Sequence, residues 1–439
     1  MHGLKSTLVL LIALAALVGY IYFVDSERTP GQADALPKAF TDISAENIVE
    51  VQIRQAGGDS ARVERIDTSW QLTEPEKADA DALQVASVTS SLASLDIQRV
   101  VDENPSDLGQ YGLDPARIEV AFRMNGETEF RRLLVGETTP TGGDLYAKTP
   151  DQSRVFLIAS FLDATFNKTA FDFRDKSLVD FDSAAVTGME IDRGSETLRF
   201  SRNGSDWRIE APIAGRADYA AVEGILTRMA SAQMQQIVAS EAANLGQYGL
   251  DRPSITLTMS GGEAPATLLI GAPGDSGLYA KDAARPLVFT IEESLATDLG
   301  KAVTDFRRKD LFDSRSFTAN RVEFRRGGLV QTFEKATADG KDVWRNAAGA
   351  NVDPTTIDDL MTRLTSLQAL SFEQGAHPTL NAPILVVNVR FDTDRTETVS
   401  FGRQGTGTDA YASRPDEPGT LQLSALPLDD IFKALDALR

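Results

Sequence analysis

The chain repeats itself at a fixed interval, and this feature limits its fold to tandem copies of one unit. Trp70, Trp207 and Trp344 are its three tryptophans, and each lies 137 residues from the next. The heptapeptide Leu-Gly-Gln-Tyr-Gly-Leu-Asp begins at Leu108 and recurs unchanged from Leu245, again 137 residues later. Self-similarity at one period is the signature of repeated supersecondary units. We therefore expect three domains in which the tryptophans occupy equivalent, largely buried strand positions.

Further motifs follow the same order in each copy. Leu145–Lys148 returns as Leu278–Lys281 and, more loosely, as Ala410–Ser413, while Asp172–Leu178 returns as Asp305–Leu311. The joins repeat as well, because a Phe-Asp-Ser sequence precedes a predicted strand twice and a phenylalanine precedes the first. These joins begin at Phe40, Phe181 and Phe312 and place the copies at residues 40–180, 181–311 and 312–439.

Each copy also contains one amphipathic helix, since apolar residues recur at steps of three and four. The apolar stripes are Val85, Val88, Leu92 and Leu95; Val222, Ile225, Met229 and Ala232; and Ile357, Leu360, Leu364 and Leu367. We interpret these stripes as core contacts that pack against the tryptophans.

Short alternating segments rich in β-branched and aromatic residues flank the helix. In the first copy the predicted strands are residues 49–54, 61–66, 70–73, 118–124, 130–135, 145–148 and 155–158. Asn125-Gly126 is a hairpin turn signal. The predicted fold class is α+β: one N-terminal transmembrane helix, then three tandem repeats of a mostly antiparallel sheet with a packed helix.

The N-terminal segment predicts a membrane anchor. Residues 7–24 contain no charged side chain, and a helix of this length spans about 27 Å. Lys5 precedes the segment and Asp25 follows it, which favours a cytoplasmic N-terminus. A cleaved signal peptide is the alternative, because Ala13-Leu14-Ala15 resembles a cleavage site, but cleavage there would leave an apolar new terminus.

The expected topology is that of a single-pass membrane protein. Residues 1–25 form the transmembrane anchor, residues 26–39 a linker, and residues 25–439 lie outside the cytoplasm. The formal net charge of −20 argues against nucleic-acid binding, because such a surface is repelled by phosphate backbones.

The inventory of reactive side chains is small. Cysteine is absent, which excludes disulfides, thiolate nucleophiles and cysteine-ligated metals. His2 and His377 are the two histidines, and His377 precedes a proline in a turn-like stretch of the third copy, where we interpret it as a loop residue. We therefore expect no catalytic, cofactor-binding or metal-binding residues.

Carboxylates are abundant, but their spacing does not indicate a catalytic pair. Adjacent acids on a helix diverge by about 100°, which applies to Glu292-Glu293, Asp358-Asp359 and Asp429-Asp430. A denser group lacks the glycine and terminal glutamate of a calcium loop. This group comprises Asp172, Asp175, Asp180 and Asp182. The glycines between Gly271 and Gly277 lack a phosphate-binding lysine and favour a hairpin turn.

The repeated Tyr-Gly-Leu-Asp element has two interpretations. Its glycines permit a left-handed backbone, so a structural corner folded back onto the sheet is the one we favour, and a binding loop stays open. The third copy keeps only Leu380 and Pro383 of the element.

The motif Leu-x-x-Tyr-Gly-Leu-x-x-Pro and the strand ends Val135-Gly136 and Ile270-Gly271 resemble those of a bacterial domain-of-unknown-function family, number 4340. In the first copy the proline comes one position early, at Pro115, and the third copy departs most. The resemblance extends over nearly all of the chain after residue 40. It implies a membrane-anchored protein often encoded beside gliding-motility-type ABC transporters, with no known catalytic residues.

We therefore expect a non-enzymatic accessory or scaffold of an ABC transport system, with permease or auxiliary subunits as partners. The alternative is a hydrolase of cell-envelope polymers that uses carboxylates alone. Such an enzyme needs one copy with acids that the other copies lack, and aligning the copies reveals no such set.

Overall fold

A computed structural model describes residues 36–338 and 341–438. The predicted anchor, residues 1–25, and most of the predicted linker lie outside the described residues. Within the described ranges, no helix has the length and apolar character needed to cross a membrane. The chain divides into two compact units, Met1–Asp175 and Lys176–Arg439. The predicted copy boundaries at residues 180 and 311 stay predictions.

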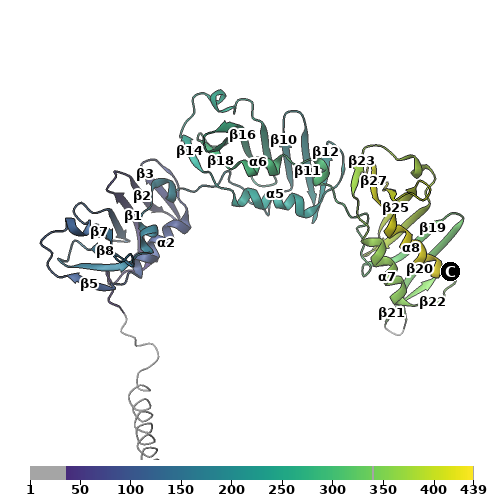
Figure 1. Cartoon of the computed structure of the whole chain (residues 1–439), viewed down its shortest axis with the longest axis horizontal. Coiled ribbons are helices and arrows are strands. Elements are labelled where there is room, and N and C mark those ends of the chain that lie inside the picture. The colour runs from purple at the N-terminus through teal and green to yellow at the C-terminus, as the bar shows by residue number, and fades with distance from the viewer. Residues whose placement is uncertain (1–35, 339–340, 439) are drawn as a thin grey trace, which may run out of the picture. The chain divides into compact units, whose positions relative to one another are not determined.

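The described residues form three nine-stranded antiparallel sheets with one strand order (Figure 1). The first has the order β4-β3-β2-β1-β6-β7-β8-β9-β5, and the other two repeat it with their own strands. The α+β class and the tandem repetition predicted from the sequence are therefore confirmed for this part of the chain.

The elements of the first repeat are β1 (Ile48–Gln55), β2 (Ser60–Ile66), β3 (Ser69–Glu74), β4 (Ala78–Asp79), α2 (Ala82–Ala93), β5 (Arg99–Asp102), β6 (Ile118–Met124), β7 (Arg131–Thr138), β8 (Asp144–Lys148), β9 (Val155–Ala159), α3 (Leu162–Phe166) and α4 (Ala170–Phe173), with 3-10 turns η2 (Ala45–Asn47) and η3 (Gly109–Tyr111). All seven predicted strands are present, whereas the short edge strands β4 and β5 were not predicted. Each is only two to four residues long, which is too short to show alternation.

The second repeat comprises β10 (Gly188–Asp192), β11 (Thr197–Asn203), β12 (Asp206–Ala211), β13 (Gly215–Arg216), α5 (Tyr219–Ser231), β14 (Gln236–Ala239), η4 (Leu245–Tyr248), β15 (Ile255–Ser260), β16 (Ala266–Gly274), β17 (Gly277–Asp282), β18 (Val288–Ile291), α6 (Glu293–Leu299) and η5 (Val303–Asp305). The third comprises β19 (Ala319–Arg326), β20 (Leu329–Ala338), β21 (Lys341–Asn346), β22 (Asn351–Val352), α7 (Pro354–Thr365), β23 (Ser371–Glu373), η6 (Pro378–Asn381), β24 (Leu385–Phe391), β25 (Arg395–Arg403), β26 (Asp409–Ser413), β27 (Thr420–Ser424) and α8 (Ala425–Ala437).

The long helix of each repeat packs its apolar stripe onto one face of its sheet. Eleven of the twelve predicted stripe residues are buried. Ala232 is the exception, because it is the C-cap of α5 with an extended backbone and is half-buried. Leu226 of α5, which was not part of the predicted stripe, is also fully buried.

The tryptophans occupy equivalent strand positions, as predicted. Trp70, Trp207 and Trp344 lie on β3, β12 and β21, and each is paired in register with a basic residue that lies over its ring. Trp207 and Trp344 are 2% exposed, but Trp70 is only half-buried. The helix explains the difference: Glu223 accepts the Trp207 indole N–H, whereas alanine holds the corresponding place, Ala86, in α2.

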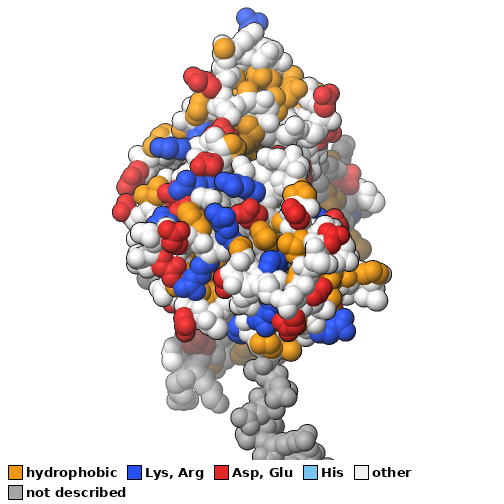
Figure 2. Space-filling view, turned by 90° about the vertical axis from the view of Figure 1, so that its left-hand side faces the viewer, with side chains coloured by type: hydrophobic (Ala, Val, Ile, Leu, Met, Phe, Trp, Pro, Cys, Tyr) orange, Lys and Arg blue, Asp and Glu red, His pale blue; other side chains and the backbone are white. Residues whose placement is uncertain are grey.

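The opposite face of the first sheet carries paired charges. Glu50 alternates with Val51, a core residue, so its carboxylate points away from the core. Its side chain is nonetheless fully buried, because Arg62 at 2.7 Å and Arg123 at 2.9 Å cover it. Acidic and basic side chains are interspersed on the face of the molecule shown in Figure 2.

Candidate functional site

The repeated Tyr-Gly-Leu-Asp element is a corner that packs against a neighbouring strand. Gly112 and Gly249 end the 3-10 turns η3 and η4 with φ angles of 66° and 68°, a left-handed conformation that favours glycine. The corner tyrosine then contacts the tyrosine of the Tyr-Ala-Lys motif. The ring centroids of Tyr248 and Tyr279 are 5.1 Å apart, and those of the first-copy pair are 5.0 Å apart. Two motifs that look separate in the sequence therefore form one packing unit.

The third copy preserves this packing with different residues. His377 precedes η6 and stacks on Tyr411, with ring centroids 3.5 Å apart and an interplanar angle of 8°. Its Nδ1 lies 2.8 Å from the hydroxyl of Thr379. The histidine thus stands where the other two copies have the corner tyrosine.

The strand-end glycines allow this close approach. A Cβ at Gly271 would lie 2.2 Å from the carbonyl oxygen of Tyr248, so the strand and the corner cannot both keep their places with a larger residue. We expect Gly271→Ala to destabilise the second repeat by about 1–3 kcal/mol, as overpacking does. Hydrogen exchange of the β15 and β16 amides in the full chain measures this loss.

The matched control is Gly262→Ala, because a Cβ there meets only the Ala264 carbonyl oxygen, at 3.9 Å. Equal protection in the two variants would show that the close approach at Gly271 does not constrain the fold.

The adjacent acid pairs on helices make separate local contacts. Asp358 accepts the Trp344 indole N–H while Asp359 binds Arg363, and Asp429 binds Arg403 while Asp430 binds Lys433. Glu292 is the N-cap residue of α6 and binds Arg228. None of these pairs converges on a common point.

The denser acid group does not form a metal site in the described residues. Asp172 belongs to the capping box of α4 with Thr169, and Asp182 accepts the backbone N–H of Ala184. Among the residues that the structure describes, no group of three or more potential ligands could hold a metal ion.

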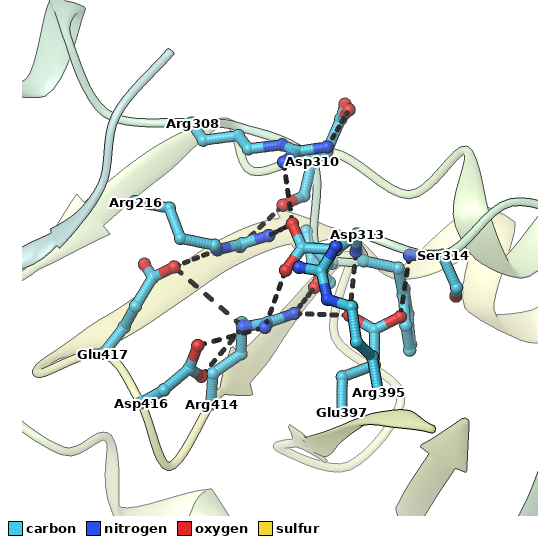
Figure 3. Close-up of polar contacts among 12 residues, drawn as sticks. Arg216, Arg308, Asp310, Asp313, Ser314, Arg395, Glu397, Arg414, Asp416 and Glu417 are labelled. Carbon is cyan, nitrogen blue, oxygen red and sulfur yellow. Dashed lines mark hydrogen bonds and ion pairs between the residues drawn. The ribbon is translucent and has the colours of Figure 1, made fainter. Parts of the chain in front are cut away.

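The second unit contains a buried ionic cluster that sequence reasoning missed (Figure 3). We define it by four arginines and four carboxylates, which balance in charge: Arg216, Arg307, Arg308, Arg414, Asp313, Glu397, Asp416 and Glu417. The residues come from β13, from the connector (residues 306–313), from β25, and from the turn between β26 and β27.

The connector positions the cluster because it pairs with both neighbouring repeats. On one side, Asp218 donates its N–H to the carbonyl oxygen of Phe306 at 2.7 Å, and Arg308 donates to that of Arg216 at 3.0 Å. On the other side, Leu311 donates to the carbonyl oxygen of Leu367 at 3.1 Å. The two sets of bonds hold the charged side chains at the junction of the second and third sheets.

Arg216 and Glu417 form the centre of the cluster. Arg216 donates to the carboxylate of Asp313 at 2.9 Å and also binds Glu417. Arg307 donates to the other oxygen of Glu417 at 3.2 Å. The Glu417 side chain is 1% exposed and that of Arg307 is 3% exposed. Isolated charges this deeply buried would cost several kcal/mol, so each depends on its partners.

Arg414 and Glu397 extend the cluster along the third sheet. Arg414 donates to Glu397 at 2.9 Å and to the carbonyl oxygen of Leu311 at 2.7 Å. Glu397 also accepts the backbone N–H groups of Asp313 and Ser314 at 2.8 and 3.0 Å. Side chains of the third repeat therefore bind the connector through both charge and backbone bonds.

The electrostatics of the cluster favour the ionised forms of Asp313 and Arg414. Burial alone raises the pKa of Asp313, but Arg216, Arg308 and Arg414 outweigh burial and hold that pKa below its ordinary value. Burial likewise lowers the pKa of Arg414, yet its bonds to Asp416 and Glu397 raise the pKa overall. Because the folded-state pKa of Asp313 is depressed, its contribution is present above about pH 3.9 and is lost at lower pH.

A cleft of about 750 Å³ lies beside the cluster, within the second unit. Its walls come from β12, β13, the first turn of α5, the connector, the end of β24 and the start of β25, and they include Trp207 and Phe391. This cleft is the candidate functional site, because it brings together side chains from two repeats.

Aligning the three copies shows that the charge of the residue differs between copies at positions that belong to the cluster. The third residue after the Tyr-Ala-Lys tyrosine is Thr149, Asp282 or Arg414 in the three copies. Three residues further on, the second copy has Arg285, which pairs locally with Asp282 at 2.8 Å, and the third has Glu417. The third copy thus reverses the charges of the second. Glu417 is therefore an acid that the other two copies lack at this position.

Comparison with curated proteins gives no match. Among solved structures, the DnaN sliding clamp (DNA polymerase III subunit beta) from Pseudomonas aeruginosa, bound to griselimycin, is similar over 89% of this chain and 93% of its own. The sequence identity is 9% and the TM-score is 0.16, which is too low to support any argument. The family model described as Domain of unknown function (DUF4340) matches residues 70–212 and 207–383. These matches cover most of the chain, so the protein belongs to the DUF4340 family.

Proposed function

We propose that this protein is a non-enzymatic accessory or scaffold of an ABC transport system. It is anchored in the bacterial inner membrane through residues 7–24, and residues 25–439 lie in the periplasm. Its repeats present protein-binding surfaces to permease or auxiliary subunits. Arrays of repeated modules bind other proteins through extended surfaces, which supports this role.

The ionic cluster is the observation that carries the proposal. Its arginines and carboxylates bind one another and the connector, so they hold two repeats together. Charged side chains that bind one another in this way support a role as a rigid spacer. Breaking any one of these ion pairs would leave a buried charge without its partner.

The same geometry disfavours the alternative, a hydrolase that uses carboxylates alone. Such an enzyme needs one carboxyl group with a raised pKa as its general acid. In the cleft, burial raises the pKa values of Asp310, Asp313 and Asp416, but their bonds to arginines and to Gln368 outweigh it and lower all three. No observation in the described part of the chain favours hydrolysis.

In-cell crosslinking with affinity capture of the full chain tests the proposed role. We expect the chain to fractionate with the inner membrane and to enrich ABC permease or auxiliary subunits above background. Repeated recovery of abundant envelope proteins alone would contradict the accessory role. Turnover of a glycan or peptide by the purified chain, abolished by Asp313→Asn, would instead favour the hydrolase.

A further inference from the structure

The edge strand β22 of the third sheet lacks a contact that the matching edge strand makes in the first repeat. There, Asp81 donates its N–H to the carbonyl oxygen of Phe173 at 2.7 Å. The N–H of Asp175 donates to the carbonyl oxygen of Asp79 at 2.9 Å, and one antiparallel bridge lies between the two bonds. An extended segment that follows the last helix of the first repeat therefore pairs with the edge of β4.

The second repeat makes the same contact with the connector. The N–H of Asp218 donates to Phe306 at 2.7 Å, and the N–H of Arg308 donates to Arg216 at 3.0 Å, again on either side of one antiparallel bridge. The pairing covers the edge, since Arg216 is only 6% exposed. In two repeats, the fold thus shows an extended segment bound to this edge through main-chain bonds.

The third repeat presents the same main-chain groups without a partner. Val352 occupies the bridging position, because it pairs in register with Trp344. Alternation along an antiparallel strand then turns the carbonyl oxygen of Asn351 and the N–H of Asp353 away from β21. Neither group is bonded to any residue within 36–338 or 341–438, and both residues are exposed. One donor and one acceptor are therefore open at the end of the third sheet (Figure 1).

The course of the last helix explains why this edge is open. In the first repeat the corresponding stretch forms two short helices, α3 and α4, and the second ends at Phe173, which bonds to the edge. In the third repeat, α8 continues without a break from Ala425 to Ala437. The side-chain amide of Gln331 on β20 donates to the carbonyl oxygen of Leu435 at 3.2 Å, so the end of α8 lies against β20.

We propose that the free edge of β22 binds an extended segment of a partner protein by strand addition, through the N–H of Asp353 and the carbonyl oxygen of Asn351. This inference rests on the proposed accessory role and names how the partner is bound. Strand addition uses main-chain bonds, which an extended segment supplies. It continues an interface that the fold already contains twice. A second copy of the chain is the other possible occupant, but a net charge of −20 on each copy opposes self-association.

Fluorescence anisotropy of the full chain in detergent tests the inference with a labelled peptide of the connector sequence, residues 305–311. We expect saturable binding. The same peptide methylated on the amide nitrogen that follows its first arginine should bind about tenfold more weakly, because it cannot donate to Asn351. This comparison needs no change in the protein, so misfolding cannot produce the difference.

Asp353→Pro removes the donor on the protein. The φ and ψ angles of Asp353 are −56° and 117°, which proline adopts without strain, and its N–H is not used within the described fold. The variant should bind the unmethylated peptide about tenfold more weakly. Asp353→Ala is the matched control, because it also removes the capping carboxylate but keeps the N–H. Its affinity should equal that of the unmodified chain.

Three results would overturn the inference: no saturable binding, equal binding of the two peptides, or equal affinities of the Asp353→Pro and Asp353→Ala variants. Self-association of the chain in sedimentation without peptide, abolished by Asp353→Pro, would also overturn it, by assigning the edge to a second copy. Failure in any of these tests leaves transporter capture, the test of the accessory role, unaffected.

Discussion

Glu417→Ala is expected to weaken the packing of the third repeat on the connector by about 3–5 kcal/mol, the largest effect of any single charge removal. The substitution leaves Arg216 and Arg307 buried without the carboxylate that both of them bind. The loss should appear as faster hydrogen exchange of the connector amides and as earlier separation of the third repeat in urea.

Asp416→Ala provides the matched control, because Asp416 binds the same cluster through Arg414 but its side chain is 49% exposed. Exposed pairs contribute little, so its cost should stay near or below about 1 kcal/mol. Similar costs for the two variants would mean that burial does not decide the energy of the cluster.

Trp207→Ala is expected to destabilise the second repeat by about 3–5 kcal/mol. The indole is 2% exposed, and its N–H is bonded to Glu223 at 2.8 Å, so truncation opens a cavity and leaves an acceptor without its donor. Hydrogen exchange of the β11 and β12 amides reports this repeat separately from the others.

Trp70→Ala is the comparison variant within the same chain. Trp70 is half-buried and its helix offers Ala86 where α5 has Glu223, so its removal should cost clearly less. Equal losses of unfolding free energy for the two substitutions would show that burial of the indole does not stabilise these strands.

The helices and strands could be predicted from the sequence, because each is indicated by a pattern of neighbouring residues. The stripe from Val85 to Leu95 lies within one helix and the adjacent loop, and alternation along β1 places Val51 and Ile53 in the core. When one face of a helix or strand is buried, apolar residues recur along it at a fixed spacing. Each copy of the element shows the same spacing. The hairpin turn between β16 and β17 was predicted from another local signal, the glycines between Gly271 and Gly277.

The corner was predicted as a structural element, but its partner was not. Tyr248 and Tyr279 are 31 residues apart, and no pattern in the sequence states that their rings meet. The close approach of the corner to the strand is evident in the structure at Gly271. A Cβ at this glycine would lie 2.2 Å from the carbonyl oxygen of Tyr248. His377 was likewise identified as a loop residue, while its stacking on Tyr411 required the structure.

The repeat, the fold class of each copy and the faces that the elements bury could be predicted from the sequence, because they depend on spacing along the chain. The candidate site could be identified only in the folded protein. Arg216 and Glu417 are 201 positions apart, and each sits at a position where the other copies carry different charges. Their contact depends on how the connector joins two sheets, and the free energy of a buried ion pair depends on partners and desolvation that no local pattern encodes.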